Sequence, residues 1–147
     1  MQMKLSLVVP CYNEADNVAA FLAATLQAFD SCGYDYEIIF IDDGSRDATM
    51  FQLRKLFAEQ KCPVKVVSFS RNFGKEAAIY AGLKQASGEY VTLIDADLQQ
   101  RPELVVQMVD FLEKNQEYDS VAMFQKDRNE GKTLSFFKKI FYLFSFY

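Results

Sequence analysis

The sequence predicts a single α/β domain with a mostly parallel sheet and helices on both faces. Short apolar runs alternate with segments of helical periodicity, which is typical of parallel strands joined by crossover helices. A length of 147 residues, 50% of them hydrophobic, is enough for one buried core. Acidic clusters directly follow two of the apolar runs, and such clusters mark the carboxyl edge of a parallel sheet.

The strands are predicted where the apolar runs are rich in Val, Ile, Leu and aromatic residues. Pro10 ends the first run because proline has no backbone N–H to donate to a neighbouring strand. Polar clusters beginning at Asp42 and Asp95 end the second and fourth runs. The predicted strands are residues 5–9, 36–41, 64–69, 90–94 and 119–124.

The helices are predicted where apolar residues recur at the spacing of an amphipathic helix, as at Val18, Phe21 and Leu22. Gly88 is expected to end the third helix in a left-handed conformation. Pro102 suits the first turn of the fourth helix, where its missing N–H has no intrahelical partner. The predicted helices are residues 16–29, 48–59, 74–86 and 102–114.

Composition argues against several classes of function. A net charge of -4 argues against a dedicated nucleic-acid-binding protein, which normally has a basic surface. The sequence contains no histidine, so a mechanism that needs imidazole as base or ligand is excluded. Cys11, Cys32 and Cys62 match no metal-ligand spacing and are expected to be reduced thiols of a cytoplasmic protein. No signal-peptide pattern and no apolar run of membrane-spanning length is present.

Residues 129–147 are predicted to form a separate basic, aromatic and amphipathic segment. From residue 132 onward this segment has three lysines, no acidic residue and many Phe, Tyr and Leu residues. One interpretation is an interfacial helix on an anionic membrane, at the start of a membrane-proximal region. The other is a core helix that packs on a continuation of the protein.

Asp95 and Asp97 follow the predicted strand at residues 90–94. Residues two apart in extended chain point to the same side, so both carboxylates can converge on one site. The small Ala96 between them leaves space for a ligand to approach the backbone. A hard cation, Mg²⁺ or Mn²⁺, would offset their repulsion and bridge to a diphosphate, with Gln99 as a neutral oxygen ligand. The alternative is a pair of solvated turn aspartates.

Asp42 and Asp43 occupy the matching position after residues 36–41, and Gly44 permits a tight turn there. One of the two aspartates is expected to cap the next helix, where Ser45 or Asp47 could also serve. The other aspartate is expected to stay at the sheet edge and accept hydrogen bonds from a base or a ribose.

The loops that follow the first and third strands leave the same edge of the sheet. Tyr12 in the first loop offers a ring for stacking on a base, and Asn13 or Glu14 could cap the next helix. The basic groups of residues 71–75 suit a phosphate. A simple turn and a solvated loop are the alternatives. The sequence contains neither a G-x-x-x-x-G-K-[ST] nor a G-x-G-x-x-G motif, so P-loop and dinucleotide-binding interpretations have no support.

Four motifs taken together resemble those of a known family: VVPCYNE at residues 8–14, IDDGSRDAT at 41–49, RNFGK at 71–75 and LIDADLQ at 93–99. They are similar to the family-two inverting glycosyltransferases with the GT-A fold, a Rossmann-like, mostly parallel sheet. The branch they most resemble contains dolichol-phosphate mannose synthase and the bacterial undecaprenyl-phosphate sugar transferases.

The resemblance assigns roles to individual residues. It implies a nucleotide-sugar-binding domain over residues 1–128, with Asp95 and Asp97 as catalytic residues and Asp97 and Gln99 as ligands of Mg²⁺ or Mn²⁺. The family usually has an arginine where Gln125 stands here, near the donor phosphate. The residues that it implies at the nucleotide and donor are Pro10, Tyr12, Glu14, Ile41, Asp43, Asp95, Ala96 and Arg128.

The activity implied by the resemblance is metal-dependent transfer of a sugar, with inversion, from a UDP- or GDP-linked donor to a polyprenyl phosphate. The expected location is the cytoplasmic face of the membrane, with no nucleic-acid partner and with homo-oligomerisation left open. A truncated, catalytically inactive nucleotide-sugar-binding module is the alternative, because family members continue well past residue 147. A receiver-like signalling domain is disfavoured because its acidic pair would follow the first strand, whereas here the acidic clusters follow the second and fourth.

Overall fold

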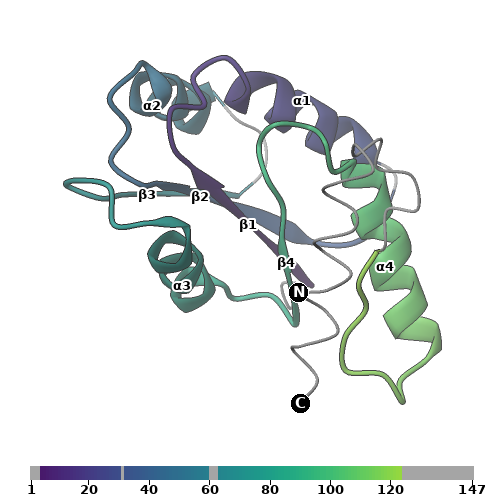
Figure 1. Ribbon diagram of the computed structural model, residues 1–147. Helices are drawn as coiled ribbons and strands as arrows, with labels where there is room; N and C mark the ends of the chain where they lie inside the picture. Colours follow the sequence, from purple (N-terminus) through teal and green to yellow (C-terminus); the bar gives the residue numbers. More distant parts are fainter. Residues whose placement is uncertain (1–3, 31, 60–62, 124–147) are drawn as a thin grey trace, which may run out of the picture.

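The computed structural model describes residues 4–30, 32–59 and 63–123. Its centre is a parallel four-stranded sheet with the order β3-β2-β1-β4. The sheet confirms the predicted α/β class with a parallel sheet, and Figure 1 shows its strands crossing the middle of the molecule. The strands are β1 (Leu5–Cys11), β2 (Tyr36–Asp42), β3 (Val64–Ser68) and β4 (Tyr90–Leu93).

The helices cover both faces of the sheet, as predicted (Figure 1). α3 packs alone on one face, against β1 and β2. The other three helices pack together on the opposite face, with α1 in contact with both α2 and α4. The helices are α1 (Val18–Phe29), α2 (Thr49–Glu59), α3 (Lys75–Gln85) and α4 (Pro102–Lys114).

Side chains that alternate between the two faces of the sheet divide the core into two layers. Leu5, Leu7 and Val9 of β1 are buried in the larger layer, together with Phe21 of α1 and Phe40 of β2. The intervening side chains face α3, where Val8, Ile39, Ile41 and Ala78 form the smaller layer. α3 can approach the sheet closely because Gly82 has no side chain. A Cβ atom there would lie 2.3 Å from Cγ1 of Val8.

The predicted elements differ from the observed ones by one or two residues at several ends, and one predicted strand is wrong. Residues 119–123 form no strand, and residue 124 lies outside the described part. A run with apolar residues becomes a strand only if a neighbouring edge pairs with it, and the described neighbour of β4 is β1 alone.

The expected left-handed cap at Gly88 is also wrong. α3 ends at Gln85, followed by Ala86 in an extended conformation, and Gly88 is not among the residues with positive φ. Gly88 instead packs against β1, where a Cβ atom would lie 2.6 Å from the backbone nitrogen of Ser6. The glycine is thus needed for close packing, not for helix termination.

Several predictions concern residues outside the described part of the chain. They include Cys62, Gln125, Arg128 and the segment 129–147, so the predicted boundary near residue 128 stays a prediction. Among the described helices, none combines the length and the apolar character needed to cross a bilayer.

Candidate functional site

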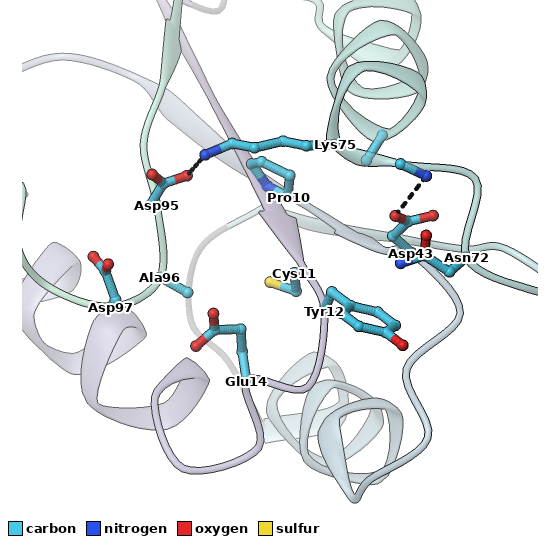
Figure 2. Close-up of a pocket in the computed structure, with 12 residues that line it drawn as sticks. Pro10, Cys11, Tyr12, Glu14, Asp43, Asn72, Lys75, Asp95, Ala96 and Asp97 are labelled. Carbon is cyan, nitrogen blue, oxygen red and sulfur yellow. Dashed lines mark hydrogen bonds and ion pairs between the residues drawn. The ribbon is translucent and has the colours of Figure 1, made fainter. Parts of the chain in front are cut away.

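A cavity of about 460 Å³ lies at the carboxyl ends of β1, β2 and β4 (Figure 2). The chain places β2 and β3 on one side of β1 and then returns to place β4 on the other side. Loops leaving β1 therefore diverge from those leaving β4, which opens a crevice at this position in parallel α/β sheets. The lining residues are Pro10, Cys11, Tyr12, Glu14, Asp43, Asn72, Gly74, Lys75, Ala78, Asp95, Ala96 and Asp97.

The loop after β1 is fixed by hydrogen bonds to the loop after β2. Asn13 adopts a φ of 57°, a left-handed conformation that asparagine tolerates better than most residues. Its backbone N–H donates to Oγ of Ser45 at 2.9 Å, and its Oδ1 accepts the N–H of Arg46 at 2.9 Å. Next to it, the Glu14 N–H donates to Oγ1 of Thr49 at 2.8 Å. These bonds hold Tyr12 and Glu14 at the cavity.

Asp47 caps α2: its Oδ1 accepts the backbone N–H of Thr49 at 2.9 Å. The expectation that Asp42 or Asp43 caps this helix is therefore wrong. Asp42 instead accepts the N–H of Ser45 at 3.1 Å and the hydroxyl of Ser68 at 3.2 Å, which stabilises the turn and the adjacent end of β3.

Asp43 holds the start of α3 in place. It is 3% exposed, and its two carboxylate oxygens accept the backbone N–H groups of Phe73, at 2.7 Å, and Gly74, at 3.0 Å. Its own N–H donates to the carbonyl of Cys11 at 2.9 Å. One carboxylate therefore joins the ends of β1 and β2 to the loop that leads into α3.

The turn after Asp43 depends on Gly44. Its φ is 65°, and a Cβ atom there would lie 2.2 Å from the carbonyl carbon of Arg71. The loop containing Asn72 and Lys75 thus packs directly on the backbone of the turn after β2. The sequence prediction that Gly44 permits a tight turn is confirmed, and the close approach of Arg71 is a second reason for glycine.

The other side of the cavity is formed by residues that follow β4. Asp95 accepts a hydrogen bond from Nζ of Lys75 at 2.7 Å, and Figure 2 shows this ion pair crossing the upper part of the site. Asp97 is exposed, and its Oδ1 accepts the N–H of Gln99 at 3.0 Å. Leu98 between them has a φ of 60°, an uncommon conformation for a leucine. Such outliers are concentrated at functional sites.

Cys11 forms a neutral part of the cavity wall. Its side chain is buried, and burial, followed by the negative charges of Glu14, Asp42 and Asp95, raises the pKa of its thiol well above the usual value. A buried thiol that stays protonated is a poor nucleophile. We therefore assign no chemical step to Cys11.

The carboxylates at the cavity suit a divalent cation whose remaining coordination positions are filled by water and a bound substrate. Among the described residues, no group of three or more His, Cys, Asp or Glu side chains gathers in a way that could hold a metal ion by itself. Mg²⁺ is commonly bound by one or two carboxylates together with water and substrate phosphates. Asp95 and Asp97 line the same cavity and fit this pattern.

Most of the residues selected from the sequence line this one cavity: Pro10, Tyr12, Glu14, Asp43, Asp95, Ala96 and Asp97. Ile41 does not, because its side chain faces α3 and is fully buried in the smaller core layer. Gln99 is exposed next to Asp97 and is not among the lining residues. Sequence reasoning selected neither Cys11 nor Ala78 for the site. Cys11 does lie within the motif at residues 8–14, whereas no charge or motif signal distinguishes Ala78 from a core residue.

The sequence profile of glycosyl transferase family 2 matches residues 6–146. An uncharacterized glycosyltransferase of Synechocystis sp. is 41% identical over 144 residues, which cover 97% of this chain and 44% of the relative. The undecaprenyl-phosphate 4-deoxy-4-formamido-L-arabinose transferase of Edwardsiella ictaluri is 38% identical over 127 residues, which cover 86% of this chain and 38% of the relative. The chain thus spans about two fifths of the length of these relatives.

Several solved structures have a similar fold. A mannosyltransferase from Pyrobaculum calidifontis, in complex with GDP-Man and Mn²⁺, gives a TM-score of 0.65 at 26% identity and covers 76% of this chain and 33% of its own. S. aureus TarS in complex with UDP gives a TM-score of 0.67 at 25% identity, covering 87% and 40%. These similarities confirm the expected GT-A fold. The parallel sheet, the acidic cavity at its carboxyl edge and the profile match over residues 6–146 agree, and the chain belongs to glycosyl transferase family 2.

Proposed function

We propose that this chain is the donor-binding part of an enzyme that transfers a sugar from a nucleoside-diphosphate sugar to a polyprenyl phosphate, with inversion. The observation that carries the proposal is the cavity where Asp43, from the end of β2, lies opposite Asp95 and Asp97, from the end of β4. Family membership supports glycosyl transfer, and the relative from Edwardsiella ictaluri, whose name specifies undecaprenyl phosphate, supports the acceptor class.

The two sides of the cavity suit the two parts of a nucleotide sugar. Tyr12 is 42% exposed and offers its ring to a base, while Glu14 and Asp43 offer carboxylate oxygens to base N–H or ribose hydroxyl groups. Asp95 and Asp97 lie at the other side, where the diphosphate and the sugar would be bound. Either UDP or GDP is compatible with these groups.

Asp97, together with Gln99, would hold the divalent cation, and Asp95 would contact the donor. A bound Mg²⁺ or Mn²⁺ stabilises the negative charge that develops on the departing nucleoside diphosphate. The acceptor needs no strong general base, because the second pKa of a phosphate monoester is near 6 and its oxygen is already ionised at neutral pH. This chemistry agrees with a sequence that contains no histidine.

A second candidate function is nucleotide-sugar binding without transfer. It is favoured by length: the chain covers 44% and 38% of two relatives, so acceptor-side residues can lie outside these 147 residues. An assay that follows nucleoside-diphosphate release from UDP- and GDP-sugars, with and without a polyprenyl phosphate, separates the alternatives. Release stimulated by the lipid supports transfer, whereas binding without release supports the second function.

Replacing Asp97 by Ala tests the donor-binding proposal itself. We expect Asp97→Ala to abolish Mn²⁺-dependent binding of UDP or GDP in calorimetric titrations. Asp35→Ala is the matched control, because Asp35 is exposed and precedes β2, at the end of the strands opposite the cavity. Unchanged Mn²⁺-dependent binding by Asp97→Ala would refute the assignment of this residue.

A further inference from the structure

Lys75 is the charged residue of the described cavity lining to which the proposed function gives no role. It is the first residue of α3, and its ammonium group lies 2.7 Å from Oδ1 of Asp95, which follows β4. The two residues are 20 apart in the sequence. This ion pair therefore bridges the crevice between the start of α3 and the residues that follow β4.

The charges around the cavity make Lys75 distinctive. Among the described residues that line the cavity, Glu14, Asp43, Asp95 and Asp97 carry carboxylates, and Lys75 is the one with a positive charge. Removing it would leave four carboxylates around the same space. A divalent cation held by Asp97 would lie close to Asp95, two residues away in the same cavity lining, so the cation and Lys75 would compete for the negative charge of Asp95.

We propose that Lys75 is an exchangeable counter-ion that pairs with Asp95 in the donor-free site and moves to the diphosphate when a nucleotide binds with its divalent cation. This inference rests on the proposed function and adds to it an order of events. Lys75 weakens binding of the cation alone, because its positive charge neutralises Asp95 beside the cation ligand Asp97. It strengthens binding of the nucleotide, because its ammonium then donates to phosphate oxygens.

Because the Lys75–Asp95 pair is exposed, breaking it requires little free energy. The side chains of Lys75 and Asp95 are 58% and 38% exposed, so solvent screens their attraction. A lysine also has a long, flexible stem with three donors, which allows it to change partner without movement of the backbone. Its helix is held independently, because Asp43 binds the N–H groups of Phe73 and Gly74 just before Lys75.

Two titrations of the full 147-residue chain test the exchange, with Lys75→Gln as the variant. In the first, Mn²⁺ is added without nucleotide and free Mn²⁺ is followed by electron paramagnetic resonance. The variant is expected to bind Mn²⁺ about 1.5- to fivefold more tightly than the wild type, the range for breaking an exposed ion pair. In the second, UDP and GDP are titrated at saturating Mn²⁺, and the variant is expected to bind about tenfold more weakly.

Lys84→Gln is the matched control, because Lys84 lies on the same helix, over the ring of Tyr80 and outside the cavity lining. It should leave both affinities unchanged. Lys75→Arg should retain most of the nucleotide affinity, and thermal melting of each variant verifies folding.

The outcomes separate this inference from the proposed function. If the wild type binds UDP or GDP with Mn²⁺ but Lys75→Gln changes neither affinity, or weakens Mn²⁺ binding as well, the exchange is refuted and the function stands. If the wild type binds neither nucleotide, the proposed function fails, and the exchange fails with it.

Discussion

The contribution of the Glu37 carboxylate to stability, and its dependence on pH, can be predicted from the structure. Glu37 lies in β2 at the end of the sheet opposite the cavity and is 1% exposed. Its Oε1 accepts the hydroxyl of Ser6 at 2.7 Å and the N–H of Ser87 at 2.8 Å, and its Oε2 lies 2.7 Å from Nζ of Lys65. The carboxylate thus joins β1, β2 and β3 to the segment after α3.

These contacts determine how far the pKa of Glu37 is shifted, and therefore how much the carboxylate contributes to the free energy of unfolding. Burial by itself would raise the pKa of Glu37, but the bonds from Lys65, Ser6 and Ser87 outweigh it and lower the pKa from 4.5 to about 2. Because the folded pKa is depressed, this stabilisation is fully present above pH 4.5 and is lost as the pH falls towards 2. The difference corresponds to about 3 kcal/mol at pH 7, of which about 2 kcal/mol is lost by pH 3.

Urea unfolding of the wild type and Glu37→Gln, at pH 7 and at pH 3, measures this contribution. We expect the variant to be about 2 to 3 kcal/mol less stable at pH 7 and to differ by about 1 kcal/mol at pH 3. Glu117→Gln, at an exposed position, is the control and should change stability little at either pH. A Glu37→Gln deficit that is equally large at both pH values would refute the assignment of this pH dependence to the Glu37 carboxylate.

Two substitutions test how the loops around the cavity are held. Gly44→Ala should destabilise the domain by about 2 kcal/mol or more, because its Cβ would lie 2.2 Å from the backbone of Arg71; a urea midpoint within error of the wild type would contradict this packing. Asp43→Asn should cost about 1 to 3 kcal/mol, because the NH₂ group that replaces one carboxylate oxygen cannot accept the backbone N–H that this oxygen accepts. Faster amide hydrogen exchange at Gly74 in Asp43→Asn would locate the loss, and unchanged exchange there would contradict it.

The fold was predictable because its signals are local. Residues of β1 and β2 are mostly apolar on both faces, as expected for central strands of a parallel sheet. Both strands extend slightly past their predicted ends, β1 through Pro10 to Cys11 and β2 to Asp42. The positions of α1 and α4 were predictable for the same reason, because the spacing of apolar residues along a helix is also a local signal. The strand expected at residues 119–124 was wrong because pairing is not a local property, and no described strand lies beyond β4.

The site was predictable to the extent that strand ends share one edge of a parallel sheet. This rule places Asp43, Asp95 and Asp97 around one cavity. It does not fix which side chains near the strand ends reach the cavity: Ile41 is fully buried beneath α3 in the smaller core layer, although it lies only two residues before Asp43. It also does not reveal pairs between distant loops, such as Lys75 with Asp95.

The central claim is that carboxylates from separate strand ends bind one metal-bridged nucleotide. The most direct measurement is paramagnetic broadening of backbone amide signals by Mn²⁺, recorded by nuclear magnetic resonance with UDP or GDP present. The account predicts broadening at residues 11–14, 72–75 and 95–97, with residues 35–37 and 87–89 at the opposite end of the sheet much less affected. Broadening centred away from the cavity, or equal at both ends of the sheet, would contradict it.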